Sequence, residues 1–405
     1  MSADFVPVIV GTDINTYLTS VSFHEEYGVK PYLLGRDSLG PTKYSTLFSR
    51  IKYDSKIEEP ESLVRALREY AQEIPHGELP LVLVGTSDKY VRLIVENRES
   101  LQDLYLLNVP SPEVNDALQD KKSFYALAEE HGLPIPETHF HEVGRPLNVD
   151  ITRYPVVVKP SNGIEYFRYQ FAGQEKVYQV DSKSELAGIV DRIEAAGYRG
   201  ELIIQDYIPG DDTVNWDSVL YLNTRGEAEL VTFGQVALQE HTASAVGNYT
   251  AVVARYDESM MTQLVQFLEK IGYTGVANAD LRYDRRDGQY KVLEFNTRQG
   301  RSSFYSTQLG HNLARYFVDD LVHGLRKPLR YAHGEALFTV VPRYILRRYV
   351  TDPVMRAEVK RLIRSGHWRS PLWYRGDRNL KRRAFLLMRD YRYASKYRHA
   401  QWLRS

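Results

Sequence analysis

The chain of 405 residues contains no cysteine. Structural disulfides, thiolate metal sites and cysteine nucleophiles are therefore excluded. No stretch reaches the roughly 18 apolar residues that a membrane-spanning helix needs. The segment Met1–Pro7 lacks both the basic region and the apolar core of a signal peptide. We therefore expect a cytoplasmic protein, with the inner face of the membrane as a further place of contact.

Net charge is also absent overall, because 52 Lys and Arg balance 52 Asp and Glu. Its distribution is uneven: residues 331–405 hold 18 basic and 5 acidic side chains, which gives +13 there and −13 elsewhere. Three interpretations of this basic segment stay open: contact with anionic lipid, contact with the diphosphate of a nucleotide-linked substrate, or docking onto the acidic body. Interleaved Trp and Tyr fit the first. No nucleic-acid recognition motif is present.

The length predicts two or three domains, and the 43% hydrophobic and 26% charged contents are those of globular proteins. Apolar runs at 6–11, 30–34 and 81–85 alternate with helical segments, which predicts a parallel α/β unit over residues 1–115. No Gly-x-Gly-x-x-Gly follows the first run, so a dinucleotide is not expected. Further along, strand-like runs and helices mix in the manner of α+β proteins.

The richest site signal is a predicted hairpin. Asp280 lies on one strand-like run, and Glu294 and Asn296 lie two residues apart on the next, beyond the turn Asp284–Gly288. Alternation at period two points Glu294 and Asn296 to the same face. Oxygen donors of this kind suit Mg²⁺. The alternative is an ordinary hairpin whose carboxylates face water.

Two further segments could hold a nucleotide. Lys159 ends an apolar strand, where its charge needs a partner such as a phosphate, and the following Ser161–Gly163 suits a loop that closes on phosphate oxygens. The alternative is a lysine that reaches water. The run Glu201–Asp212 is an apolar strand that leads into a Pro-Gly turn, where backbone groups could pair with an adenine edge. Its alternative is a plain strand and acidic loop.

Taken in order, Lys121, Lys159, Gln205–Asp212, Asp280 and Glu294–Arg298 resemble the motifs of the ATP-grasp superfamily. The resemblance implies a parallel α/β (pre-ATP-grasp) domain at 1–115 and a two-lobed ATP-grasp domain at 116–330. The small lobe would span about 150–210, and a basic C-terminal subdomain would follow at 331–405. It also implies that ATP is contacted by two groups of side chains. The phosphate group is Lys121, Lys159 and Ser161, and the nucleoside group is Gln205, Asp206, Tyr207, Ile208 and Asp212, the last at the ribose.

The resemblance also implies roles for the predicted metal ligands. Asp280 would hold one Mg²⁺, Glu294 would bridge two and Asn296 would hold the second, with Mn²⁺ as the alternative ion. Arg298 stabilises the transferring phosphoryl group. D-Alanine ligases usually carry an Arg two residues before the metal Asp, and Asn278 stands there instead. Arg298 or Arg301 would have to supply that charge.

Within the superfamily, the segments around Lys159 and Gln205 look most similar to carboxylate–amine ligases of the D-aspartate ligase type. Such enzymes form an amide through an acyl phosphate, joining an amino-acid carboxylate to an amine of a nucleotide- or lipid-linked peptidoglycan precursor. The alternatives are another amino-acid or dipeptide ligase, a phosphotransferase, or a non-catalytic ATP-binding regulator. The last is disfavoured because Asp280, Glu294, Asn296 and both lysines, Lys121 and Lys159, are present.

Two segments are candidates for substrate contact. Arg301, with Ser302 and Ser303, suits a substrate carboxylate, which arginine binds through two parallel hydrogen bonds. The alternative is a helix N-terminus that faces the phosphates. His241, in a loop of small residues that runs to Tyr249, would assist deprotonation of the amine. Its alternative is a solvated histidine on a surface loop.

Overall fold

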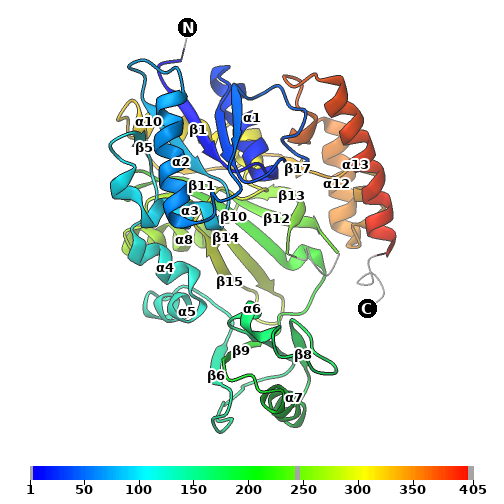
Figure 1. Ribbon diagram of the computed structural model, residues 1–405. Coiled ribbons are helices and arrows are strands. Elements are labelled where there is room, and N and C mark those ends of the chain that lie inside the picture. Colours follow the sequence, from blue (N-terminus) through cyan, green and yellow to red (C-terminus); the bar gives the residue numbers. More distant parts are fainter. Residues whose placement is uncertain (1–2, 242–246, 400–405) are drawn as a thin grey trace. The chain divides into compact units, whose positions relative to one another are not determined.

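The computed structural model describes residues 3–241 and 247–399, and the chain forms two compact units (Figure 1). Unit 1 contains residues 1–119, 211–281 and 294–405, and unit 2 contains residues 120–210 and 282–293. The N-terminal region and the C-terminal segment therefore fall into one unit together with the larger part of the middle of the chain. Residues 242–246 of the predicted His241 loop, and Trp402 in the basic segment, lie outside the described residues.

Unit 1 begins with a sheet of five parallel strands. In sheet order these are β3 (Arg50–Tyr53), β2 (Tyr32–Gly35), β1 (Val6–Val10), β4 (Leu81–Gly85) and β5 (Tyr105–Leu106). The helices between them are α1 (Ile14–Tyr27), α2 (Pro60–Glu73) and α3 (Asp88–Glu96). Asp13 caps α1 and Ser87 caps α3 through side-chain oxygens, so both helices start directly beyond a buried strand. The predicted parallel α/β unit is confirmed.

The second sheet is mixed, and the order along its main path is β15-β14-β10-β12-β13-β17-β18; off this path β11 pairs with β10, and β16 pairs with β11. The strands are β10 (Asn215–Leu222), β11 (Ala228–Val231), β12 (Phe233–Gln239), β13 (Tyr249–Arg255), β14 (Gly275–Asp284), β15 (Gln289–Asn296), β16 (Arg330–Tyr331), β17 (Leu337–Thr339) and β18 (Trp368–Arg369). The associated helices are α4 (Pro112–Gln119), α8 (Glu258–Lys270), α9 (Phe304–Gln308) and α10 (Leu313–Leu321). One apolar core joins α1 and α10 to this sheet.

The C-terminal segment is docked onto the rest of unit 1. It supplies β17 and β18 to the large sheet, and its helices are α11 (Arg343–Tyr349), α12 (Pro353–Ser365) and α13 (Leu380–His399) (Figure 1). Arg382 is fully buried, pairs with Asp377 at 2.8 Å and lies 3.8 Å above the Tyr17 ring of α1. Lys396 pairs with the carboxylate of Glu240. These contacts favour the docking interpretation of the basic segment.

Unit 2 is built on a four-stranded antiparallel sheet in the order β6-β9-β7-β8. The strands are β6 (Thr138–Glu142), β9 (Glu201–Asp206), β7 (Val156–Pro160) and β8 (Tyr178–Val180), and the helices are α5 (Lys121–Glu130), α6 (Gly163–Tyr166) and α7 (Lys183–Ala195). Apolar side chains of β7, β8 and β9 pack against α7 to form its core. Asn162 caps α6, so the expected loop after Lys159 turns into a short helix.

No helix of the described residues is both long and apolar enough to cross a membrane.

Candidate functional site

The predicted metal ligands gather on β14 and β15 of unit 1. The Asn296 amide Nδ2 donates to Asp280 Oδ2 at 3.1 Å. Burial, together with the negative charges of Glu294 and Asp217, raises the pKa of Asp280 well above its usual range. The interpretation of this hairpin as ordinary exposed surface is therefore wrong for Asp280. Its carboxylate lies among other acids, and the positive charge of Arg298 offsets their effect only in part.

A positive charge that acts on Asp280 and Asp217 comes from Arg298, which follows β15. Its guanidinium contacts Asp88 through Nε at 2.9 Å and Nη2 at 3.1 Å, and Nη2 also donates to Asn296 Oδ1 at 3.1 Å. Asp88 is the first residue of α3, directly beyond β4. Arg298 therefore ties the hairpin to the carboxyl edge of the parallel sheet. The sequence gives no sign that Asp88 and Arg298 are partners, because they lie 210 residues apart.

Asp217 is a functional candidate that the sequence analysis missed. It lies in the middle of β10, is fully buried, and accepts hydrogen bonds at Oδ1 from Asn278 at 2.7 Å and Ser302 at 3.0 Å. Burial raises its pKa to about 6. Its Oδ2 is buried and has no hydrogen-bond partner in the part of the chain that the structure describes. A single acid within the apolar run Asn215–Leu222 is the signal that could have found it.

The residues present fit a divalent cation. Two carboxylates and an amide oxygen are the hard donors that Mg²⁺ accepts, and water and phosphate oxygens usually complete its shell. The unpartnered oxygen of Asp217 and the raised pKa of Asp280 both indicate negative charge that lacks compensation. No group of three or more His, Asp and Glu side chains is gathered for a metal within residues 3–241 and 247–399. The predicted set therefore depends on Asn296 as its third donor.

Arg301 lies just beyond this cluster. Its Nε is buried and has no hydrogen-bond partner among the described residues, and burial lowers the pKa of the guanidinium. A partly buried guanidinium with one unsatisfied N–H suits a carboxylate ligand. Ser302, predicted beside it as a substrate contact, instead donates to Asp217. Ser303 precedes α9, and its buried hydroxyl has no partner.

Asp212, the predicted ribose ligand, lies in unit 1 with both carboxylate oxygens engaged. It accepts from Gln239 Nε2 at 2.9 Å and from the Gln239 backbone N–H at 3.1 Å, and it contacts His241 Nε2 at 2.8 Å. His241 is only 9% exposed and packs edge-on against the Tyr397 ring. The expectation of a solvated His241 is therefore wrong, because Asp212 and α13 enclose its ring.

The other predicted nucleotide contacts lie in unit 2. Lys159 on β7 reaches the Gln205 side-chain oxygen on β9 at 3.5 Å. The amide nitrogen of Gln205 donates to Tyr125 at 2.7 Å and to Thr138 at 2.8 Å. The structure thus brings Lys159 and Gln205 together on adjacent strands and holds the Gln205 amide in a fixed orientation.

Asp206 is committed to an ion network, in which Arg153 and Arg286 contact its carboxylate at 2.8 Å and 2.6 Å. Only its backbone is left for a ligand. Tyr207 is half-buried and Ile208 is buried, in the linker that follows β9. Lys121 is the first residue of α5, whereas Ser161 is exposed and contacts Glu201. These positions agree with a linker that would meet a base mainly through its backbone.

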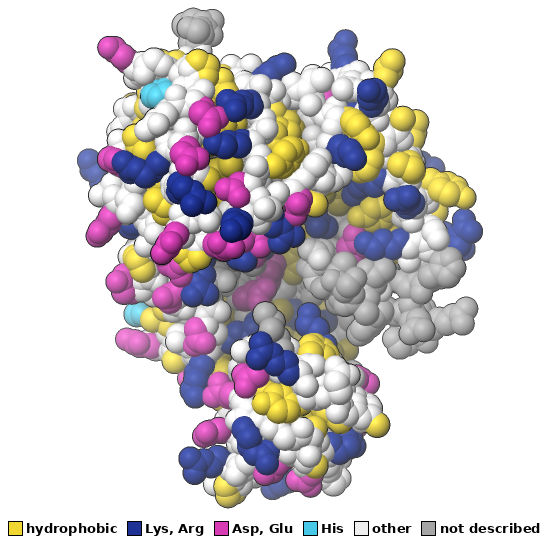
Figure 2. All heavy atoms as spheres, viewed as in Figure 1, with side chains coloured by type: hydrophobic (Ala, Val, Ile, Leu, Met, Phe, Trp, Pro, Cys, Tyr) yellow, Lys and Arg dark blue, Asp and Glu magenta, His cyan; other side chains and the backbone are white. Residues whose placement is uncertain are grey.

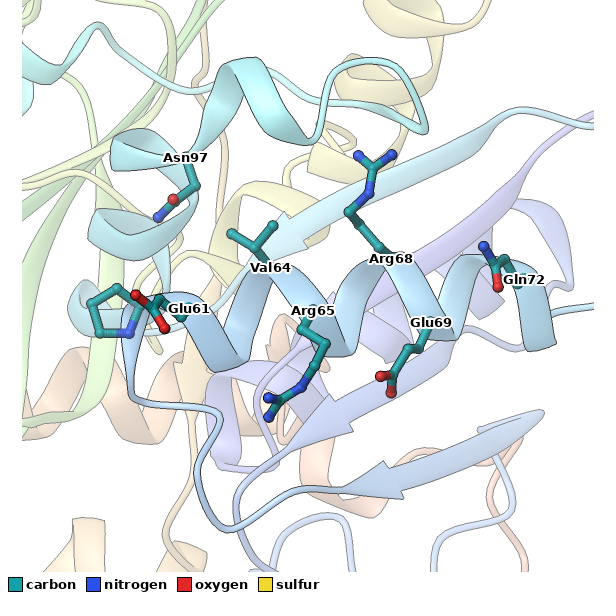
Figure 3. Close-up of a pocket in the computed structure, with 8 residues that line it drawn as sticks. Glu61, Val64, Arg65, Arg68, Glu69, Gln72 and Asn97 are labelled. Carbon is teal, nitrogen blue, oxygen red and sulfur yellow. The ribbon is translucent and has the colours of Figure 1, made fainter.

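A shallow hollow of about 530 Å³ lies over the outer face of α2 and contains none of the predicted site residues (Figure 3). Arg68 at its rim pairs with Asp103 at 3.0 Å. Figure 3 shows its lining side chains spread along one helix, with Asn97 beside them. The hollow is therefore an ordinary surface depression.

No family model matches the sequence. Over 398 residues the chain is 32% identical to D-aspartate ligase of Enterococcus faecium (strain Aus0004), which covers 95% of this chain and 94% of that protein. The chain belongs to the D-aspartate ligase family. It is accordingly an ATP-dependent carboxylate–amine ligase, as its motifs predicted.

Solved structures agree with this fold. The L-amino acid ligase of Bacillus licheniformis matches with a TM-score of 0.59 and 16% identity, over 84% of this chain and 80% of that one. The ADP complex of N5-carboxyaminoimidazole ribonucleotide synthetase matches with a TM-score of 0.56 and 12% identity, over 83% and 81%. The biotin carboxylase domain of a Hydrogenobacter thermophilus 2-oxoglutarate carboxylase, solved with MgADP, matches with a TM-score of 0.60 and 13% identity, over 82% and 74%. The predicted ATP-grasp fold of this D-aspartate ligase family member is confirmed.

Proposed function

We propose that this ligase activates a carboxylate of D-aspartate and joins it to an amine of a peptidoglycan precursor. The observation that carries the proposal is the full-length relationship to D-aspartate ligase. Arg301 supports it, because a partly buried guanidinium whose Nε lacks a hydrogen-bond partner among the described residues suits the second carboxylate of a dicarboxylic amino acid. Ser302, predicted beside it, is then a less direct contact, since it is already bonded to Asp217.

In this proposal Asp280, Glu294 and Asn296 hold Mg²⁺, with Glu294 between two ions. Bound there, the ions would neutralise phosphate oxygens while phosphate is transferred. Arg298 is fixed by Asp88 and Asn296, so its charge is already oriented before any ligand binds. The cluster of acids around Asp280 supports this assignment, because a cation would remove their mutual repulsion.

The proposal keeps the remaining nucleotide contacts that the motifs imply. In unit 2, Lys121, Lys159 and Ser161 would contact phosphates, and Gln205 to Ile208 would frame the adenine. The contact of Lys159 with Gln205 supports a shared role of β7 and β9. In unit 1, Asp212 would bind ribose hydroxyls through oxygens that also hold Gln239 and His241. His241 would then orient Asp212, a simpler role than deprotonation of the amine.

The first test identifies the amino acid without knowing the amine. Purified protein is incubated with ATP, Mg²⁺, hydroxylamine and one amino acid at a time, because hydroxylamine converts an acyl phosphate into a stable hydroxamate and releases phosphate. We expect hydroxamate from D-aspartate and much less from L-aspartate, D-asparagine or D-alanine. Equal yields from all four would contradict a D-aspartate-specific site.

The second test identifies the acceptor. Nucleotide-linked and lipid-linked precursors that carry a free side-chain amine are supplied in place of hydroxylamine, and ADP release and amide formation are followed together. A product that gains the aspartyl mass and retains no phosphate supports the ligase. A phosphorylated product would indicate a phosphotransferase instead, and ADP release with a different amino acid would indicate another amino-acid ligase.

Replacing Mg²⁺ by Mn²⁺ in the same assay tests the metal preference. Cytoplasmic location remains a prediction. Contact of residues 331–405 with an anionic membrane is part of the proposal, because the acceptors of such ligases include lipid-linked precursors.

A further inference from the structure

Helix α13 has two contrasting faces. Its inner face is buried on the body of unit 1 through Arg382, Leu386 and Tyr397. Its outer face exposes large hydrophobic side chains, namely Leu380 (77% exposed), Leu387 (63%), Met388 (49%) and Tyr391 (77%). At about 100° per residue, these four project from about a third of the helix circumference. We call them the α13 stripe.

The stripe is accompanied by basic side chains. Lys381, Arg383, Arg392 and Arg398 are all exposed on the same helix. None of the four forms an ion pair within residues 3–241 and 247–399. The single acidic residue of α13, Asp390, accepts a hydrogen bond from Trp373 at 3.1 Å and contacts Arg389. The outer face is therefore apolar and positive at once, as Figure 2 shows over α13.

We infer that the outer face of α13 is a docking surface for an anionic membrane. An interfacial helix places apolar side chains at the boundary between headgroups and acyl chains, and its Lys and Arg contact acidic headgroups. The α13 stripe and its basic neighbours have this composition. The buried pair of Arg382 and Asp377 fixes the helix on the protein, so the surface is already formed before it meets lipid.

Two other occupants fit less well. A second copy of the chain would bring four unpaired positive charges against the same four charges, which opposes a symmetric dimer through this face. A soluble diphosphate is too small, because Lys381 and Arg398 are separated by about 25 Å along a helix that rises 1.5 Å per residue. An extended layer of negative headgroups matches that spread of charge. The inference rests on the proposed membrane contact of residues 331–405 and narrows it to one helix face; it concerns residues outside the ligase site and holds whichever amino acid is activated.

The test is co-sedimentation of the full-length protein with vesicles of phosphatidylcholine, with and without phosphatidylglycerol. We expect binding that requires phosphatidylglycerol and weakens as salt rises. The double variant Arg383→Gln/Arg392→Gln should bind about 25-fold more weakly, at about five-fold per charge. Leu387→Ser/Tyr391→Ser should also lose binding. Matched controls that leave α13 intact are Arg65→Gln/Arg225→Gln for charge and Leu325→Ser for an exposed apolar residue.

All variants should keep wild-type hydroxamate activity in solution and wild-type thermal stability, because the changed side chains are exposed. Lack of sedimentation by the wild-type protein would overturn the inference. Equal loss of binding in the α13 and control variants would do the same. Sedimentation velocity gives the third decisive result: a dimer that dissociates in Leu387→Ser/Tyr391→Ser, without vesicle binding, would assign the stripe to self-association.

Discussion

One hairpin carries two acidic clusters with opposite electrostatics. Asp284, at the end of β14, is bonded to Arg286 at 2.6 Å and Arg153 at 3.1 Å, and the Arg286 guanidinium lowers its pKa to about 2. Asp280 lies four residues earlier on the same strand. Burial and the neighbouring acids raise its pKa well above the usual range.

The difference separates a structural cluster from a functional one. Around Asp284 and Asp206, two guanidiniums compensate two carboxylates, so nothing further is needed. Around Asp280, Arg298 acts on several acids, and it is shared with Asp88. Folded proteins keep acids crowded in this way mainly where a ligand supplies counter-charge.

The largest effect is expected from Glu294→Gln, which removes one of the acids beside Asp280. Removing one charge that would hold Mg²⁺ should lower ATP-dependent turnover by about 10²–10³-fold. The fold should remain intact, because glutamine matches glutamate in size and shape. The measurements are ADP release and the melting temperature. Asp287→Asn, at the exposed turn of the same hairpin, is the matched control and should keep full activity; near-normal activity of Glu294→Gln would refute the metal assignment.

The compensated cluster should respond in the opposite way to Asp284→Asn. The loss of this buried carboxylate leaves Arg153 and Arg286 with Asp206 alone, and should lower the free energy of unfolding by about 2 kcal/mol. The half-exposed guanidiniums keep the effect below that of a fully buried pair. Urea denaturation measures it. A stability equal to that of Asp287→Asn would show that the network contributes nothing.

Lowering the pH should remove the stabilisation that the Asp284 carboxylate provides. The pKa of Asp284 is lower in the folded state than the usual 3.8, so its contribution is complete above about pH 4 and is lost as pH falls towards about 2. The stability difference between wild type and Asp284→Asn, about 2 kcal/mol at neutral pH, should therefore shrink over that interval. Urea midpoints at several pH values test this. A difference independent of pH would mean that ionisation of Asp284 is not its source.

The smallest effect is expected from Asp88→Asn, which weakens the orientation of Arg298 and leaves its charge in place. We expect turnover to fall about five- to ten-fold, in line with about 1 kcal/mol for a lost charge-assisted contact. The KM for ATP should change less than kcat if Arg298 acts mainly during phosphoryl transfer. Because Asp88 follows the cap Ser87, helix α3 should persist, and circular dichroism checks that. Unchanged turnover would mean that Arg298 needs no support from α3.

The sequence predicted the elements that have strong local signals. Strands β1 and β4 are unbroken apolar runs, and α1, α3 and α5 begin at side-chain caps. Strand β3 escaped prediction because Arg50–Tyr53 is polar and lies at a sheet edge. Helix α2 was also missed, although its apolar residues follow helical periodicity. Strand β6 was not predicted either, because it has two histidines in five residues and no apolar run.

For the site, the alternation of side chains within the hairpin was enough to predict that Asp280 and Asn296 lie together. Both residues belong to one supersecondary element, so their contact is local. The partners that tune them come from far along the chain. Asp217 is 61 residues from Asn278, and Asp88 is 210 residues from Arg298. Such pairs depend on tertiary packing, which no pattern of spacing encodes. The expectation of a solvated His241 was wrong for the same reason, because its burial depends on packing against α13.

The close approach of Gly300 to Asn278 has a consequence for how this lineage can diverge. A Cβ built on residue 300 would lie 1.7 Å from Asn278 Oδ1, so no larger residue fits there while the amide is in place. Asn278 in turn bonds to the buried Asp217. A longer side chain at 278, such as the arginine of D-alanine ligases, would displace the backbone at 300 and the partner at 217. We therefore expect positions 217, 278 and 300 to covary among relatives. A substitution at one of them should be accompanied by substitutions at the other two.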